Sequence, residues 1–552
     1  MVIIYSIVTI TYFLFSLFLL RSKRIRIQEI KYQLMLFFIL LLSFIVRIYA
    51  FDRLPNIDLD EAMGGVNAWS LGNYGIDYFH LAKNPVYLYA WGSGMNILYP
   101  LIAAPFVKYM GLSIISYRLP LIIISTFSIL LLAYSLYRVQ FFNNVQRLLT
   151  LMIIFLSPIT ICASRWAVES NLFISLMVIV TSFFILFVTE YNQYAKSTYL
   201  ILMTLTIGLA AYCYSNNWVF LFSFTVCLYL WLLLKKKLSL IQSLCSILVL
   251  AIECFPLVLF MYVNFFSHKE IRILGLTIPK LAASRSAFAI ENGHIISSII
   301  NNFINSVRLL LSGYEGIPKI SPQFWGAFYP LMLAFFLIGV INYLVNEKHL
   351  IDTFMFLMFL SALWNVFLIL PNFLHFNSIM LPILYFEARG VYQSFANNHS
   401  LLIFSAIFLF CLVGASRSYI TNHVNDGFNS TGNTAPAELE TMIDSANRYK
   451  GRIVLASSRD IRGTNSLAYF ILPIFYTRID PYTFHKEASY VHPSEFMSYR
   501  KFGKWEIENV QTGKRLYKGQ GVYIVQKGID ISKHPHKLLK KGTYYNMYFF
   551  DK

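Results

Sequence analysis

Apolar runs long enough to cross a membrane recur along almost the whole chain, and they decide what it can fold into. A transmembrane helix needs about 20 mostly apolar residues. Runs near that length stand at 2–20, 33–50, 115–136, 148–163, 172–190, 199–214, 218–234, 243–265, 326–346, 351–370, 378–396 and 400–416. Charged residues make up only 13% of the 552-residue chain, roughly half the share in an average soluble protein. We therefore expect a mainly α, polytopic membrane protein with about 11–13 transmembrane helices.

Basic segments predict the orientation of these spans, because Lys and Arg collect in cytoplasmic loops. The run 2–20 is followed, not preceded, by basic residues in 21–31, so the N-terminus should lie outside and a cleaved signal peptide is not expected. Arg138, Arg147 and the triplet Lys235–Lys237 then fall in cytoplasmic loops. The same rule accounts for the formal net charge of +18. Nucleic acid is therefore not expected as a partner.

The spans divide the chain into three regions. Residues 1–32 hold the first span and a basic cytoplasmic loop, and residues 33–416 form the main transmembrane module, with outer loops at 52–114 and 266–325. Within the first of these loops, Asn96–Met110 is apolar but short, and Pro100 and Pro105 interrupt it. We interpret this run as an interfacial or re-entrant helix, because a span there would reverse the orientation of everything that follows.

Residues 417–552 change to the composition of a soluble domain. The pattern predicts an amphipathic helix at 436–450 and strands at 452–457 and 521–526. We expect a small extracytoplasmic α/β domain there, joined to the membrane module by the Asn- and Gly-rich stretch 423–435.

The first outer loop carries the acidic cluster Asp58, Asp60 and Glu61 directly after the second span. A carboxylate at that place can act as a general base on a substrate held against it. The alternative is an ordinary solvated acidic loop. Downstream, Lys83 begins an aromatic stretch through Tyr87. Its ammonium could meet a phosphate or, equally, a lipid headgroup.

Two further polar groups lie near span ends. Arg165 and Glu169 are four residues apart, so on a helix they share a face and could pair with each other or line a cavity. His375 and Asn377 should lie at the outer face, and Glu387 with Arg389 near the inner face. We interpret the last pair as a topology feature.

Taken in order, these motifs resemble the GT-C fold glycosyltransferases of the protein O-mannosyltransferase and aminoarabinose transferase superfamily (family 39-like). The matching stretches are Asp60-Glu61, Lys83-Asn-Pro-Val-Tyr87, Tyr117-Arg-Leu-Pro120, and Ser157-Pro with Ser164-Arg165 and Glu169. The longer pattern, with Tyr-Gly-Ile-Asp and Trp-Gly-Ser-Gly-Met-Asn, is similar to a Gram-positive subgroup that modifies cell-wall polysaccharides. The resemblance spans about 33–396. It departs at Asn84, where the family has proline, and at His375, where it often has arginine.

The resemblance implies an inverting transfer of a sugar from a polyprenyl-phosphate donor to an extracytoplasmic glycan, such as a wall polysaccharide or teichoic acid, at the plasma membrane. Asp60 would be the base, with Glu61 and Glu169 orienting groups or binding the acceptor. The residues that it implies for substrate binding are Lys83, Tyr87, Arg118, Arg165, Arg285, His375 and Asn377. No cofactor is required, although Asp58, Asp60 and Glu169 could hold Mg²⁺ or Mn²⁺ in a minority case.

Two other functions fit the topology. A transporter or flippase of lipid-linked glycans would carry charges along a central path, whereas here the polar groups gather at the outer ends of the spans. A non-catalytic scaffold would keep the topology and tolerate loss of Asp60 and Glu169. The sequence does not name the sugar or the acceptor.

Overall fold

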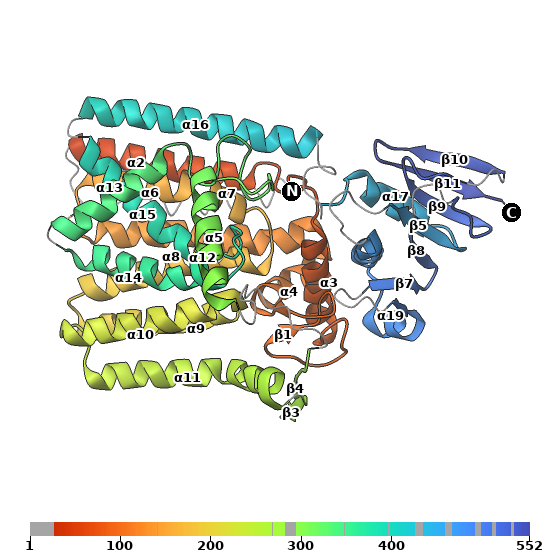
Figure 1. The fold of residues 1–552 in the computed structure, drawn as a ribbon, viewed down its shortest axis with the longest axis horizontal. Helices are drawn as coiled ribbons and strands as arrows, with labels where there is room; N and C mark the ends of the chain where they lie inside the picture. Colours follow the sequence, from red (N-terminus) through yellow and green to blue (C-terminus); the bar gives the residue numbers. More distant parts are fainter. Residues whose placement is uncertain are drawn as a thin grey trace.

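The computed structural model describes the chain from Ile27 to Asp551, apart from 141, 268, 282–293, 347, 396–397, 426–433, 459–465, 492–497, 511–514 and 532–534. The predicted first span at 2–20 and Arg285 lie outside the described residues. Most of the rest is a bundle of helices that run lengthwise in Figure 1. Its members are α2 (Ile27–Ile48), α5 (Ile114–Tyr137), α6 (Asn144–Leu156), α8 (Glu169–Thr189), α9 (Gln193–Ala211), α10 (Trp218–Leu234), α11 (Leu240–Tyr262), α13 (Met332–Val345), α14 (Leu350–Leu368), α15 (Asn377–Ser394) and α16 (Asn398–Asn425).

These helices confirm the predicted class of a mainly α, multi-pass membrane protein. Nine helices of the described chain are long and apolar enough to cross a bilayer, eight of them in this bundle and the ninth at Ile295–Ser312. The predicted run 148–163 is divided into α6 and a short α7 (Pro158–Ala163), because Pro158 occupies the first position of α7, where its missing N–H costs nothing. The helix α16 continues past the predicted end of the last span, to Asn425.

Hydrogen bonds between helix ends show that successive helices alternate in direction. Asn377 at the start of α15 donates to the carbonyl of Ser170 at the start of α8 (2.8 Å), and Asn217 before α10 donates to Asn377 (2.7 Å). Asn365 in the last turn of α14 donates to Asn217 (2.9 Å). At the opposite end, Arg138 after α5 pairs with Glu190 after α8 (3.0 Å). The predicted cytoplasmic loops therefore share one end of the bundle.

The first outer loop lies wholly at the other end. It contains α3 (Leu59–Tyr74), the two-stranded ribbon β1 (Tyr87–Leu88) and β2 (Met95–Asn96), and α4 (Leu98–Met110). Because α5 begins where α2 ends, as the contacts of Arg118 with the carbonyls of Phe51 and Pro55 show, α4 makes no net crossing. Its 13 residues also span only about 20 Å. This placement agrees with the interpretation of the run at 96–110 as interfacial or re-entrant.

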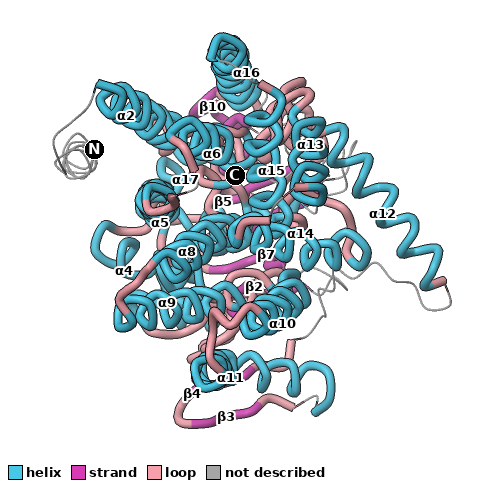
Figure 2. The backbone as a smooth tube through the Cα atoms, turned by 90° about the vertical axis from the view of Figure 1, so that its left-hand side faces the viewer, coloured by secondary structure: helices cyan, strands magenta, loops and turns pink. Residues whose placement is uncertain are grey.

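A helix that the sequence analysis did not anticipate lies in the second outer loop. After the hairpin β3 (Ile271–Ile273) and β4 (Leu276–Ile278), α12 runs from Ile295 to Ser312 and lies across the bundle axis in Figures 1 and 2. Its Asn302 and Ser306 donate to backbone carbonyls near the end of α14 (3.1 and 3.2 Å), while its apolar side chains are largely exposed. Such a helix suits the plane of a membrane interface.

The C-terminal region forms the predicted α/β domain. A seven-stranded sheet has the order β10-β11-β9-β5-β8-β7-β6, in which β5 is parallel to both of its neighbours. The predicted helix and two strands correspond to α17 (Glu438–Asn447), β5 (Ile453–Ser457) and β9 (Gly521–Gln526). The remaining elements are α18 (Ile471–Thr477), α19 (Pro481–Glu487), β6 (Ser489–Val491), β7 (Ser498–Phe502), β8 (Trp505–Asn509), β10 (His536–Lys541) and β11 (Tyr545–Phe550).

This domain packs directly on α3 and the turn after it. The ring of Phe475 in α18 lies against Gly65, where an added Cβ would meet it at 2.7 Å. Tyr78 donates to the carbonyl of Ile479 (2.8 Å), and Arg478 donates to the carbonyl of Leu112 (3.1 Å). The first outer loop is therefore held between the helical bundle and the C-terminal domain (Figure 1).

The helices α13 and α15 pack closely through two glycines, Gly339 and Gly390. This contact gives a prediction about stability. A Cβ on Gly390 would lie 1.8 Å from the carbonyl oxygen of Phe335, which is backbone and cannot swing away. We expect Gly390→Ala to destabilise the protein by about 1–3 kcal/mol through overpacking. Thermal unfolding in detergent measures this loss. The control is Gly451→Ala, where a Cβ meets no atom within 4 Å; equal losses in both variants would contradict the packing argument.

Candidate active site

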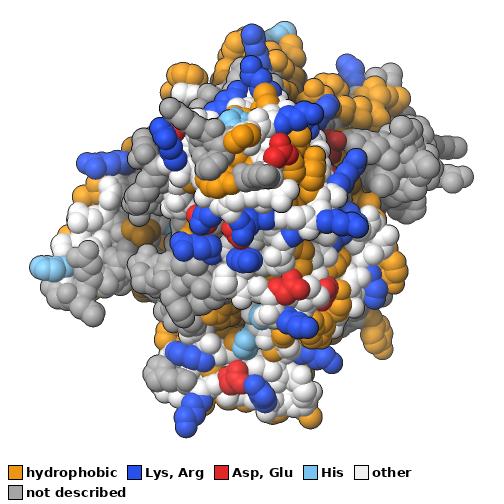
Figure 3. Space-filling view, turned by 90° about the vertical axis from the view of Figure 1, so that its right-hand side faces the viewer, with side chains coloured by type: hydrophobic (Ala, Val, Ile, Leu, Met, Phe, Trp, Pro, Cys, Tyr) orange, Lys and Arg blue, Asp and Glu red, His pale blue; other side chains and the backbone are white. Residues whose placement is uncertain are grey.

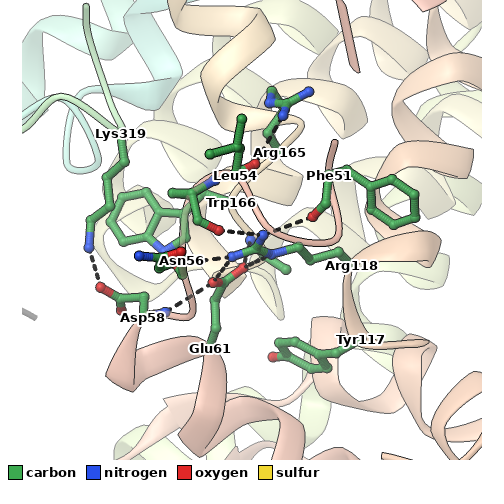
Figure 4. A network of polar contacts seen from close by, with 12 residues as sticks. Phe51, Leu54, Asn56, Asp58, Glu61, Tyr117, Arg118, Arg165, Trp166 and Lys319 are labelled. Carbon is green, nitrogen blue, oxygen red and sulfur yellow. Dashed lines mark hydrogen bonds and ion pairs between the residues drawn. The ribbon is translucent and has the colours of Figure 1, made fainter. Parts of the chain in front are cut away.

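The acidic cluster of the first outer loop forms the N-terminus of α3. Asp58 is the N-cap residue and accepts the backbone N–H of Asp60 (2.9 Å), while the Glu61 carboxylate accepts the N–H of Asp58 (3.2 Å). This reciprocal capping box satisfies two helix-end donors that would otherwise be unpaired. The sequence Asp-Leu-Asp-Glu therefore starts a helix and also fixes three carboxylates within one turn. Those of Asp58 and Glu61 are labelled in Figure 4.

Glu61 is buried and paired with Arg118 from α5. Arg118 donates Nε to one carboxylate oxygen (2.8 Å) and Nη2 to the other (2.5 Å). Its remaining donors contact the carbonyls of Phe51, Pro55 and Asn56. The backbone N–H of Ala167 also donates to Glu61 (2.8 Å). All five guanidinium donors of Arg118 are thus occupied, so the pair holds α2, α3 and α5 together and leaves Arg118 no donor for a phosphate.

Asp58 is fully buried and forms an ion pair with Lys319, whose side chain is 3% exposed. Lys319 comes from the segment between α12 and α13, and its ammonium lies 4.3 Å from the ring centre of Trp166. Burial raises the pKa of Asp58, and the Lys319 ammonium opposes that rise. The sequence analysis missed Lys319, because 261 residues separate the two partners and no motif surrounds it.

Asp60 differs from both neighbours. It is only partly buried, and the indole N–H of Trp91 donates to its Oδ1 (2.8 Å). Within the described part of the chain, no Lys, Arg or His forms an ion pair with it. Its place in the first turn of α3 stabilises a negative charge through the helix dipole. Asp60 is therefore the carboxylate of this cluster with an oxygen available to a substrate.

Tyr117 and Glu169 lie at the same end of the bundle as Asp60. The buried hydroxyl of Tyr117 has no hydrogen-bond partner among the described residues, and it lies within electrostatic reach of Asp60, Glu61 and Glu169. An added Cβ on Gly64 of α3 would meet that hydroxyl at 2.0 Å. Glu169, the first residue of α8, is partly exposed. The predicted residues Asp60, Glu61, Arg118 and Glu169 are thus brought to one end of the bundle.

Arg165 has a structural position. Its terminal nitrogens donate to the carbonyls of Val46, Arg47, Tyr49 and Leu54 at 2.7–3.0 Å. These carbonyls lie at and just beyond the C-terminal end of α2, where helices leave such groups unpaired. Arg165 therefore caps α2, a position that differs from both sequence-based alternatives, pairing with Glu169 or lining a cavity.

The other residues predicted to bind substrate lie at the same end of the bundle as Asp60. Lys83 is exposed, and Tyr87 stacks on Phe260 of α11 with ring centres 4.6 Å apart. Asn84 accepts the N–H groups of Val86 and Tyr87 (3.0 Å each) and so makes the turn itself. His375 contacts the carbonyl of Leu370 through Nδ1 (2.8 Å).

The alternative metal set of Asp58, Asp60 and Glu169 does not come together. Among the described residues, no three His, Cys, Asp or Glu side chains are placed to share an ion. The physical reason is local, because Lys319 already occupies the carboxylate of Asp58.

Comparison with known proteins gives a result for the fold. No protein-family model and no curated protein matches the sequence. Among solved structures, the chain is similar to ArnT from Cupriavidus metallidurans bound to undecaprenyl phosphate, with a TM-score of 0.54 and 11% identity over 93% of this chain and 97% of that chain. It also matches archaeal oligosaccharyltransferase AglB from Archaeoglobus fulgidus (TM-score 0.46, 10% identity, 81% of this chain and 64% of that one). A third match is arabinofuranosyltransferase AftD from Mycobacteria (0.44, 11%, 96% and 42%).

At 11% identity the likeness to ArnT concerns architecture. It extends over both the helical bundle and the C-terminal domain, since it covers 93% of this chain. The chain therefore has the GT-C fold.

Proposed function

We propose that this protein is an inverting glycosyltransferase, which moves a sugar from a polyprenyl-phosphate donor in the membrane to an extracytoplasmic glycan. The observation that carries the proposal is Asp60, a partly exposed carboxylate beside two carboxylates that buried cations have already neutralised. ArnT, which shares the fold, was solved with undecaprenyl phosphate. That lipid is the product expected when such a donor gives up its sugar.

The proposed chemistry is one displacement. Asp60 takes the proton from the hydroxyl of the incoming glycan, and the oxygen of that hydroxyl forms a bond to the anomeric carbon. The bond between this carbon and the phosphate oxygen breaks, and polyprenyl phosphate leaves with the electron pair. Trp91 orients Asp60 through its indole N–H. Glu61 and Arg118 act at a distance by fixing the first turn of α3.

The leaving phosphate needs cationic stabilisation. The terminal donors of Arg118 and Arg165 bind groups of the protein itself. These two residues are therefore assigned to positioning the elements around the site. Lys83 is the first candidate, because its ammonium is exposed in the same outer loop as Asp60. His375 and, outside the described residues, Arg285 are further candidates. Glu169 is proposed to orient the acceptor.

The site is proposed to face the outside of the plasma membrane. Arg138, Arg147 and the lysines at 235–237 lie at the opposite end of the bundle from α3, which fits a cytoplasmic location for that opposite end. The region from 434 to 552 has nineteen Lys and Arg against eleven Asp and Glu, and blue side chains are spread over its end of the molecule in Figure 3. A basic surface favours an anionic acceptor such as teichoic acid.

A liposome experiment tests the function. The purified protein is reconstituted with a radiolabelled polyprenyl-phosphate sugar and a wall-glycan acceptor, and the label is followed in both substances. We expect label to pass to the acceptor. Movement of the donor across the bilayer without transfer would instead support a flippase. If the label neither reaches the acceptor nor crosses the bilayer, a scaffold is the remaining function.

A further inference from the structure

An apolar groove runs between α2 and α16, and no residue of the proposed mechanism lines it. These two helices lie along one edge of the bundle in Figure 1, and α11 lies along the opposite edge. The groove has a volume of about 560 Å³. Its walls are apolar side chains from both helices, namely Phe38, Leu42 and Val46 of α2 and Leu409, Leu412 and Val413 of α16.

Polar side chains line only one end of this α2–α16 groove. They are Ser416, Arg417 and Thr421 of α16. The residues that follow Arg417 on α16 pack against the segment just after α2, because Tyr419 and Leu54 belong to one buried cluster. The polar end of the groove is therefore the end that faces the first outer loop, and the apolar part extends from there toward the middle of the bundle.

Arg417 has features of a residue that binds an anion from outside the chain. It is exposed, and among the described residues no carboxylate forms an ion pair with it. The preference of arginine for cytoplasmic loops does not explain its position, because it lies at the end of the bundle opposite to the basic loops. Since α16 continues to Asn425, Arg417 stands on the last span and not in the C-terminal domain.

We propose that the α2–α16 groove binds one anionic glycerophospholipid from the leaflet next to the first outer loop. The guanidinium of Arg417 binds the lipid phosphate, a group for which arginine has a matching set of donors. The hydroxyls of Ser416 and Thr421 lie at the same end, and one acyl chain lies along the apolar walls.

The length of the groove agrees with one leaflet. From Phe38 to Val46 the helix α2 rises by about 12 Å, and from Leu409 to Thr421 the helix α16 rises by about 18 Å. One leaflet contributes about 15 Å to the hydrocarbon core of a bilayer. An acyl chain whose phosphate binds Arg417 would therefore extend along the whole apolar part of the groove.

The polyprenyl-phosphate donor is not expected in this groove. Tyr87 and the neighbouring Lys83 belong to the candidate active site, and Tyr87 stacks on Phe260 of α11 (4.6 Å between ring centres). That helix lies at the opposite edge of the bundle from α2 and α16 (Figure 1). The inference thus goes beyond the proposed function, and its test needs no sugar donor.

Native mass spectrometry of the full-length protein tests the lipid site. The purified protein in detergent is mixed with equal amounts of phosphatidylglycerol and phosphatidylcholine that carry the same acyl chains, and the retained lipids are identified by mass. We expect the parent protein to retain one phosphatidylglycerol, with a preference of about fivefold over phosphatidylcholine. This factor is what one basic residue typically contributes to the binding of an anionic lipid.

One pair of variants tests the cation. Arg417→Met removes the guanidinium and should bring the preference for phosphatidylglycerol close to one. The matched control is Arg308→Met, which removes an exposed arginine of α12. Figure 2 shows α12 and α2 on opposite sides of the bundle, so this control should keep the preference of the parent.

A second pair tests the apolar walls while leaving Arg417 in place. Val413→Trp puts a large ring into the groove at an exposed position and should reduce the retention of both lipids by about fivefold or more. The matched control is Ile407→Trp, at a position that is also exposed on α16 but does not line the groove. It should retain phosphatidylglycerol as the parent does.

Three results would overturn the inference. A parent protein that retains neither phospholipid contradicts it, whether the apolar segment 2–20 or a second copy of the chain covers the groove instead. A retained mass equal to polyprenyl phosphate alone would assign the groove to the donor. If Arg417→Met keeps the parent's preference, Arg417 does not bind the headgroup and the proposal fails.

Discussion

Replacing Asp60 with asparagine is expected to slow sugar transfer by about 10²–10⁴-fold, the usual contribution of a general base. The amide can still accept the indole N–H of Trp91, which bonds to Oδ1 in the native site. The fold and the binding of the donor should therefore change little. Single-turnover transfer in liposomes measures the chemical step, and equilibrium binding of the labelled donor measures the affinity for the donor.

The matched control is Asp480→Asn. Asp480 caps α19 through its side chain, at a distance from the acidic cluster, and asparagine retains that cap. We expect this variant to transfer sugar at close to the parent rate. Loss of a general base costs at least ~10²-fold in rate. If Asp60→Asn also keeps more than about half of the parent rate, Asp60 is therefore not the base.

Glu61→Gln should give the largest loss of stability. It leaves the Arg118 guanidinium, which is 1% exposed, in the interior without its counter-charge. Breaking a buried ion pair by removing one partner costs about 3–5 kcal/mol. Thermal and denaturant unfolding of the purified protein in detergent should show this loss directly.

Two comparisons make the stability prediction specific. Glu270→Gln breaks the exposed pair with Arg272 and should cost roughly 0–1 kcal/mol. The double variant Glu61→Leu with Arg118→Met removes both buried charges, so it should recover part of the loss. A Glu61→Gln variant as stable as Glu270→Gln would contradict the view that this pair holds the first outer loop to the bundle.

The bundle was predictable because each span is a continuous apolar run, and hydropathy alone reports such runs. The helix α12 was missed because its polar stripe, which includes Asn302 and Ser306, interrupts the apolar run. The acidic motif at Asp60 was predictable from its place after a span. Its surroundings were not, because the pairing of Asp58 with Lys319 depends on a contact across 261 residues.

The arginines show a second limit of sequence reasoning. Arg118 and Arg165 match a family pattern, and from sequence they were expected to bind substrate. In the structure Arg118 is bonded to Glu61 and three backbone carbonyls, and Arg165 caps the end of α2. A guanidinium that binds carbonyls and one that binds phosphate have the same sequence signature, because both need the same five donors. Only the tertiary arrangement tells them apart.

The configuration at the anomeric carbon tests the central claim most directly. A donor of known configuration is supplied to the reconstituted protein, and nuclear magnetic resonance of the product reports the new glycosidic bond. Direct attack assisted by Asp60 predicts inversion, because one displacement at the carbon forms no covalent intermediate. Retention of configuration would contradict the account, since it requires a carboxylate to act as a nucleophile in a two-step reaction.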